Sequence, residues 1–243
     1  MKGRRSRLPT SVNILDRHPL SPYHSGLEFF GVAHWRTMAM AFLNSNLGYG
    51  ALTKLFHWLI VLLFASQYLS ATIMLHTPAE ATTLGVSQAT YYNWHKSLGL
   101  VALMVAIARL INRRAGELPP WAPTLTTLEQ FIIHRAEQLL YAAMLIMPLS
   151  GFLYVMTGGY GVVLFGLFDL PNPMPSSTVI ASVAKWIHVA SAILLLLPLG
   201  THLGIVLGHH FGQNDRLIDR ILPGRPSKAA GDGREHKQQL RKS

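Results

Sequence analysis

Long stretches without a charged side chain are the feature that most restricts how this chain can fold. Residues 186–214, for example, contain no Asp, Glu, Lys or Arg. A helix that crosses the hydrocarbon core of a membrane needs about 20 mostly apolar residues. We therefore predict four membrane-spanning helices, at about 54–75, 92–112, 131–156 and 184–210.

The second predicted span has the shortest uncharged core. Lys96 and Arg109 lie near its ends, where long basic side chains can extend to the membrane surface. A transmembrane β-barrel is excluded because its strands alternate polar and apolar residues, whereas HVASAILLLLPLGTHLGIVLG is continuously apolar. Four such segments in one chain also argue against a soluble helical protein. The predicted fold class is all-α, an integral-membrane four-helix bundle.

The few charged residues predict the orientation of this bundle. Only 13% of residues are charged, against about 25% in an ordinary soluble domain, yet the formal net charge is +10. All Lys and Arg except Lys96 and Lys185 fall in residues 1–54, 109–135 and 209–243. Basic residues accumulate on the cytoplasmic side, so we expect both termini in the cytoplasm. The positive charge follows the span ends, which favours a membrane protein over a nucleic-acid-binding one.

Three regions follow from these patterns. Residues 1–47 form a basic N-terminal extension that we expect to be poorly ordered, and residues 1–45 lack the features of a signal peptide. Residues 48–223 hold the four-helix domain. Residues 224–243 are polar and are predicted to be a disordered cytoplasmic tail.

The chain has no cysteine and 12 histidines. Without cysteine there is no disulfide, no thiolate-ligated haem or iron–sulfur cluster, and no covalent haem attachment through C-x-x-C-H. Any redox or metal chemistry must therefore use histidine or carboxylate ligands.

Four histidines fall inside the spans at matched depths. His188 and His202 lie fourteen residues apart on the last span, which places them on nearly one helix face, about 21 Å apart. His57 matches the depth of His202, and His95 matches the depth of His188. Titratable residues inside a span are costly and indicate function. The spacing predicts two histidine pairs, one near each membrane surface.

Haem b held between facing helices, with one axial histidine from each side, suits two such pairs best. Zinc suits them less because its sites use three or four close ligands. The alternative is that these histidines are hydrogen-bonded packing residues and bind no metal. Three further histidines are weaker candidates: His134 lies beside Arg135 near the interface, and for His209 and His210 we expect contacts at the inner membrane surface.

Several residues near the histidine pairs can be interpreted in two ways. Lys96 and Lys185 can balance haem propionates or attract a small anion, and they can equally serve as interfacial anchors. We interpret Arg109 mainly as a basic residue that anchors the cytoplasmic end of its span. The alternative is that it pairs with a haem propionate or a quinone. The tryptophans beside proposed ligands suit either porphyrin packing or an interfacial aromatic belt: these are Trp58, Trp94 and Trp186.

The segments LFHWLIVLLF, YYNWHKSLGL, LLYAAMLIMPLSGFLY and KWIHVASAILLLLPLGTHLGIVLGHHF resemble the four helices of the bacterial cytochrome b561 family. The resemblance covers about residues 48–223. It implies two non-covalent, bis-histidine haem b groups, His57 and His202 on the inner one and His95 and His188 on the outer one. It also implies a multi-pass protein of the bacterial inner membrane that exchanges electrons with quinone. Many relatives carry a histidine where this chain has Glu137, with His134 three residues earlier.

The resemblance implies an oxidoreductase or electron-transfer cytochrome that passes electrons from a donor such as superoxide, outside, to the quinone pool. A haem b anchor subunit of a larger dehydrogenase or hydrogenase, with a redox partner protein, is the main alternative. A haem-free metal-binding transporter is a third hypothesis from a different class. No nucleic-acid partner is expected.

Overall fold

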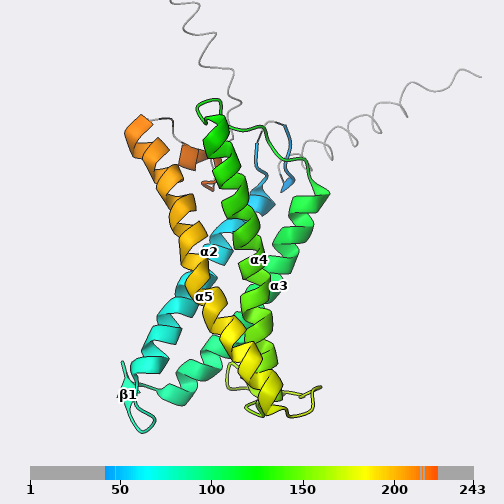
Figure 1. Ribbon diagram of the computed structural model, residues 1–243, viewed down its shortest axis with the longest axis vertical. Coiled ribbons are helices and arrows are strands. Elements are labelled where there is room, and N and C mark those ends of the chain that lie inside the picture. Colours follow the sequence, from blue (N-terminus) through cyan, green and yellow to red (C-terminus); the bar gives the residue numbers. More distant parts are fainter. Residues whose placement is uncertain (1–41, 47, 214, 216, 224–243) are drawn as a thin grey trace, which may run out of the picture. The chain divides into compact units, whose positions relative to one another are not determined.

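The computed structural model describes residues 42–46, 48–213, 215 and 217–223. The expectations for residues 1–41 and 224–243 lie outside these described residues. Four long helices dominate the described part (Figure 1): α2 (Ala51–His76), α3 (Gln88–Ala115), α4 (Thr127–Thr157) and α5 (Thr178–Leu207).

All four helices are long and apolar enough to cross a membrane, which confirms the four predicted spans. Each helix begins before its predicted apolar window. The last begins at Thr178 and continues past Leu207 as a π-helical segment, η1 (Gly208–Gln213). A short 3-10 helix, η2 (Leu217–Arg220), follows.

Polar caps explain why three helices begin before their apolar windows. The Ser87 hydroxyl accepts a hydrogen bond from the Thr90 amide at the start of α3. At the start of α4, Thr126 and Glu129 form a reciprocal capping box. The Ser177 hydroxyl caps α5 in the same way as Ser87 caps α3. These caps satisfy amides that have no partner within the helix.

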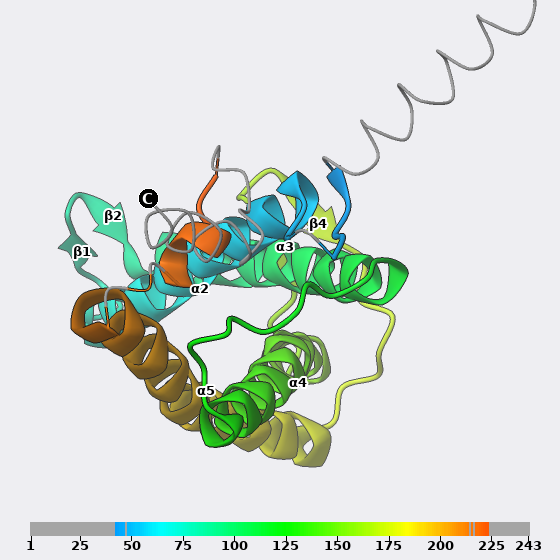
Figure 2. The ribbon, with the colours of Figure 1, turned by 90° about the horizontal axis from the view of Figure 1, so that it is seen from above.

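The helices pack as two neighbouring pairs, α2 with α3 and α4 with α5, and α3 also contacts α4. Figure 2 shows this arrangement from above. A small core of Ile60, Ala106 and Met144 joins three of the helices. Large apolar side chains face outward, such as Leu197, which is 73% exposed. A bundle with so apolar an outer surface is suited to a lipid bilayer.

Two β-hairpins close the connections at one end of the bundle, the lower end in Figure 1. Strands β1 (Thr82–Thr83) and β2 (Val86–Ser87) pair antiparallel, as do β3 (Val162–Leu164) and β4 (Phe168–Leu170). The first hairpin turns at Leu84 and Gly85, both with positive φ, as a two-residue type I′ turn requires. The hydropathy pattern predicts only loops at these positions.

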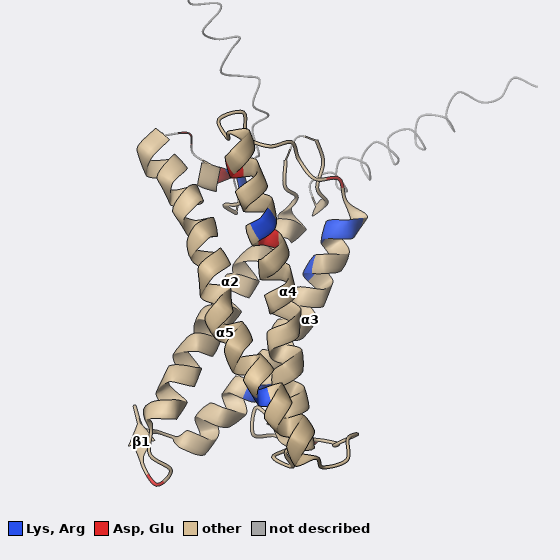
Figure 3. Ribbon diagram, in the orientation of Figure 1, with Lys and Arg blue, Asp and Glu red and all other residues tan. Residues whose placement is uncertain are grey.

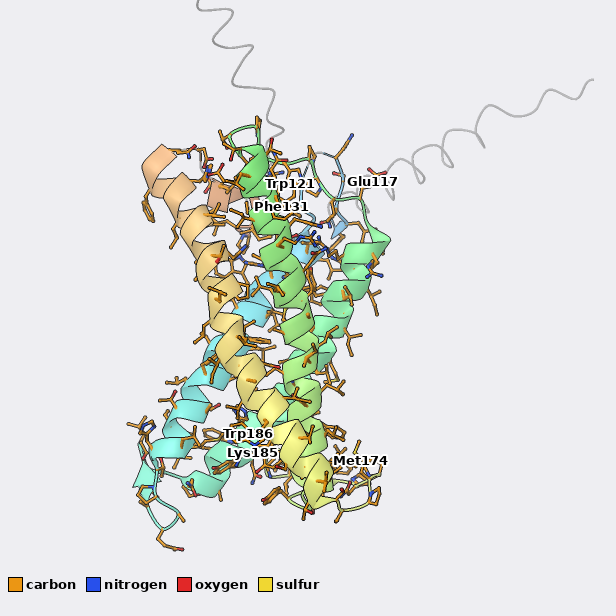
Figure 4. All side chains as sticks on the ribbon, viewed as in Figure 1. Glu117, Trp121, Phe131, Met174, Lys185 and Trp186 are labelled. Atoms are coloured by element: carbon orange, nitrogen blue, oxygen red, sulfur yellow. The ribbon has the colours of Figure 1, made fainter. Side chains whose placement is uncertain are left out.

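Charge and tryptophan mark the two ends of the bundle. Figure 3 shows mid-helix regions that are mostly tan, with Lys, Arg, Asp and Glu toward the ends. Figure 4 places Trp121 at one end and Lys185 with Trp186 at the other. Both tryptophans are exposed, as in the aromatic belts of membrane proteins.

Candidate haem-binding site

His57 of α2 and His202 of α5 lie side by side, with ring centroids 6.5 Å apart and ring planes at 55°. His95 of α3 and His188 of α5 form a second pair, with centroids 6.1 Å apart and planes at 84°. We call these the inner pair and the outer pair, after the predicted topology. The structure thus brings together the same partners that the depth argument matched.

These separations fit two imidazoles on opposite sides of one metal ion. A metal–imidazole bond is about 2.0 Å long and the bonding nitrogen lies about 1.2 Å from its ring centroid, so opposed ligands have centroids about 6.4 Å apart. Among the described residues no group of three His, Cys, Asp or Glu side chains could hold a metal ion. Two-ligand sites of the haem type therefore fit this geometry better than zinc sites.

Hydrogen bonds orient both rings of the outer pair. His188 Nδ1 lies 2.7 Å from the Met147 carbonyl oxygen, which can only accept, so Nδ1 donates. His95 Nδ1 lies 3.1 Å from Ser70 Oγ, and that hydroxyl already donates to the Gln67 carbonyl. Both rings then carry their proton on Nδ1 and keep a free lone pair on Nε2. This is the usual arrangement of a metal-binding histidine.

A glycine makes room for one of these rings. A Cβ atom at Gly151 would lie 2.8 Å from His188 Nδ1 and 2.9 Å from Cε1. Because such contacts are too short for a carbon atom, any side chain at Gly151 would displace the ring. Sequence reasoning missed this position because a single glycine in an apolar helix carries no distinctive signal.

The inner pair has different surroundings. Arg109 Nη2 lies 3.3 Å from His57 Nδ1, and because guanidinium only donates, this Nδ1 accepts. His202 Nδ1 is buried and has no hydrogen-bond partner within the described part of the chain. The two pairs are therefore not equivalent, although their spacings are similar.

An arginine–tyrosine cluster lies beside the inner pair. Arg109 Nε donates to the Tyr141 hydroxyl over 3.2 Å, and the Arg109 and Arg113 guanidinium groups both lie over the Tyr141 ring. Arg113 forms an ion pair with Glu137 at 3.1 Å. Glu137 thus serves as the partner of an arginine.

A polar hollow of about 560 Å³ opens near the start of α5. Its lysine, Lys185, is exposed and precedes His188 by one helical turn. The other lining residues mostly bring hydroxyl groups: Tyr154, Thr157, Gly158, Tyr160, Ser176, Ser177, Thr178, Ala181 and Ser182. One ammonium group among hydroxyl groups suits a small anionic or polar ligand. The second lysine on this side, Lys96, instead donates to the Gly161 carbonyl and holds the β3–β4 hairpin.

The tryptophan beside the inner pair has a structural contact. Trp58 Nε1 donates to the Ile221 carbonyl over 3.0 Å and so ties α2 to the segment after η2. Trp94 makes an edge contact with Tyr91, and Trp186 is 68% exposed.

The weaker histidine candidates lie away from both pairs. His134 is exposed and accepts a hydrogen bond from the Gln138 amide. His209 is buried and lies between two carboxylates, 3.0 Å from Glu129 and 2.7 Å from Asp215. It thereby joins the start of α4 to η1 and to Asp215 after it. His210 Nδ1 is buried without a partner among the described residues.

Fold and site together define a four-helix integral membrane protein whose core holds two histidine pairs. The family model for prokaryotic cytochrome b561 matches residues 48–224. The chain belongs to the prokaryotic cytochrome b561 family. Membership implies haem b binding and electron transfer in a membrane.

Two curated relatives from Escherichia coli (strain K12) are similar over most of their length. Cytochrome b561 homolog 2 is 25% identical over 186 residues, which cover 75% of this chain and 95% of the relative. Cytochrome b561 homolog 1 is 25% identical over 169 residues, which cover 70% of this chain and 93% of the relative. The matched region is thus close to the whole of each relative.

Proposed function

We propose that this protein is a di-haem cytochrome b that carries electrons across the membrane from a one-electron donor outside to the quinone pool. The observation that carries the proposal is the near-equal spacing of two histidine pairs, 6.5 Å and 6.1 Å between ring centroids. His57 and His202 are the proposed ligands of the inner haem. His95 and His188 are the proposed ligands of the outer haem.

His57 with His202, and His95 with His188, would each hold one haem b, which would supply a one-electron redox centre suited to outer-sphere electron transfer. The protein's part is to hold the rings. Ser70 and the Met147 carbonyl fix the outer rings with Nε2 free, and Gly151 leaves space for one of them. The apolar bundle keeps water from the centres.

The hollow beside Lys185 is the proposed entry point for the donor. It lies one helical turn from His188, and its ammonium and hydroxyl groups suit a small anion such as superoxide. Two superoxide anions lose one electron each and leave as O2. The quinone takes up these two electrons and two protons and becomes quinol.

The orientation of the chain belongs to the same proposal. Basic residues at the 109–135 connection and after α5 favour the cytoplasm, which supports an inner pair near that side and a hollow on the outer side. Quinone dissolves in the bilayer that the exposed apolar helix faces contact. The inner membrane of a bacterium is the proposed location.

Purified protein tests the proposal directly. We expect a haem b spectrum with two haems per chain, reduction of the haems by superoxide, and their reoxidation by a short-chain ubiquinone. A colourless protein would contradict haem binding. A haem-loaded protein that superoxide does not reduce, but that co-purifies with a large dehydrogenase or hydrogenase, would favour the anchor-subunit alternative.

A further inference from the structure

Arg109 is a cation in direct contact with a proposed haem ligand. Its Nη2 donates to His57 Nδ1 over 3.3 Å, its Nε donates to Tyr141, and its Nη1 is buried without a hydrogen-bond partner in the described residues. Guanidinium stays protonated in proteins. The inner pair therefore has a permanent positive charge at its edge.

No described carboxylate forms an ion pair with Arg109. The nearest arginine in the cluster, Arg113, holds Glu137 at 3.1 Å and so is locally neutralised. Because a charge inside a low-dielectric bundle is poorly screened, this half-buried guanidinium acts on the ring that it contacts. The Arg109 guanidinium therefore stabilises negative charge that arrives beside His57.

The outer pair lacks an equivalent charge. Its two Nδ1 atoms face a carbonyl oxygen of Met147 and the hydroxyl of Ser70, both neutral. The nearby lysines do not form hydrogen bonds with either ring in the described structure: Lys96 binds the Gly161 carbonyl, and Lys185 is exposed at the hollow. Water and salt screen the charge of the exposed Lys185.

The hydrogen bonds at the Nδ1 atoms of the outer pair act in the same direction. An Nδ1–H that donates to a carbonyl makes the imidazole a stronger electron donor to its metal, which favours the oxidised metal. The outer ligands thus favour loss of an electron. At the inner site the Arg109 guanidinium, 3.3 Å from His57, favours the gain of an electron through its positive charge.

We infer that Arg109 makes the inner site the stronger electron acceptor and so directs electrons from the outer site to the inner site. The inference rests on the proposed function. In each transfer one electron leaves the outer site, which is oxidised by one equivalent, and the inner site is reduced by one. Arg109 is a positioning and tuning residue in this role because it acts through the His57 ring and its own charge.

A spectroscopic redox titration of the haem-loaded protein tests this inference. In the wild type we expect two midpoint potentials, with the higher one belonging to the inner site. Arg109→Gln should reduce the equilibrium constant for reduction of the inner site about tenfold or more. Its midpoint potential should therefore fall by about 59 mV or more, since a tenfold change is about 59 mV for a one-electron couple. Arg109→Lys, which keeps the charge, should shift the midpoint potential of the inner site much less.

Arg114→Gln is the matched control, because Arg114 lies on the same helix but is exposed. It should leave both potentials unchanged. Potentials in Arg109→Gln that equal those of the wild type would overturn the inference. So would an equal shift in Arg109→Gln and Arg114→Gln, since that would reflect net charge alone.

A second variant decides the question if Arg109→Gln does not assemble. Glu137→Gln removes the negative charge that Arg113 balances and leaves Arg109 in place. The higher potential should then rise, and an unchanged value would contradict the inference. Failure of the proposed function looks different, because the wild type itself would then lack two titrating haems.

Discussion

Gly151 of α4 lies directly against the imidazole of His188 on α5, so closely that a Cβ atom at this glycine would be 2.8 Å from Nδ1. The same ring donates to the carbonyl of Met147, one turn earlier on α4. Two backbone features of one helix therefore set the position of a side chain on its neighbour.

Gly151→Ala should selectively weaken the outer site. The added methyl group displaces the His188 ring and breaks its hydrogen bond to Met147, so the haem-to-protein ratio should fall from about two toward one. Haem extraction from purified protein measures this ratio. Gly200→Ala is the control, because nothing lies within 4 Å of a Cβ there. Full haem content in Gly151→Ala would show that the close fit has no role in binding.

Lys185→Gln should slow reduction by superoxide about tenfold at low ionic strength, because it removes the cation beside the hollow. The difference from wild type should shrink as salt is added, since exposed charges are then screened. Stopped-flow absorbance of the haems measures the rate. Arg135→Gln, which removes an exposed arginine near the start of α4, should have no such effect. Equal slowing in both variants would mean that net charge alone matters.

Asp215→Asn should destabilise the protein in a pH-dependent way. Burial opposes ionisation of Asp215, but hydrogen bonds from Thr124, His209 and the Leu217 amide outweigh it and hold the pKa below 3.8. Its stabilisation, about 1.5–3 kcal/mol, is therefore fully present above pH 3.8 and is lost as the pH falls through the lowered pKa.

The midpoint of thermal haem loss measures this effect. At pH 5–6 the midpoint of Asp215→Asn should lie below that of the wild type, and the two should converge under more acidic conditions. Asp169→Asn, on the exposed β4 strand, serves as the control. A difference that stays constant below pH 3.8 would refute the assignment to the Asp215 carboxylate.

Trp58→Phe distinguishes two roles of this tryptophan, the hydrogen bond to Ile221 and packing on a porphyrin. If its indole mainly ties α2 to Ile221, the variant should lose about 1 kcal/mol of stability, and residues 217–223 should be cut faster by protease. The haem spectrum should not change. A shifted haem spectrum with unchanged proteolysis would instead favour porphyrin packing. Trp121→Phe, at an exposed tryptophan, is the control.

The spans and the histidine pairs could be predicted from the sequence because both depend on regular geometry. A membrane requires long uncharged helices, and a constant rise per residue converts the spacing of His188 and His202 into depth. The helix starts were less predictable, since the caps Ser87, Thr126 and Ser177 lie outside the apolar windows. The hairpins were missed because two-residue strands leave no hydropathy pattern.

The surroundings of the rings could not be predicted. The contacts between Arg109 and His57, and between Gly151 and His188, join different helices, and their register depends on packing that no local pattern encodes. Arg109 was interpreted mainly as a topological anchor, whereas the structure places it on a proposed ligand. His209 was expected to make contacts at the membrane surface, and instead it is buried between Glu129 and Asp215.

The most direct test of the central claim is the haem content of single histidine variants, with redox titration to identify which haem is lost. The account predicts that His57→Ala and His202→Ala lose the same haem and keep the other. His95→Ala and His188→Ala should lose the second haem, and His134→Ala should keep both. Loss of one common haem from variants of both pairs, or loss from His134→Ala alone, would contradict it.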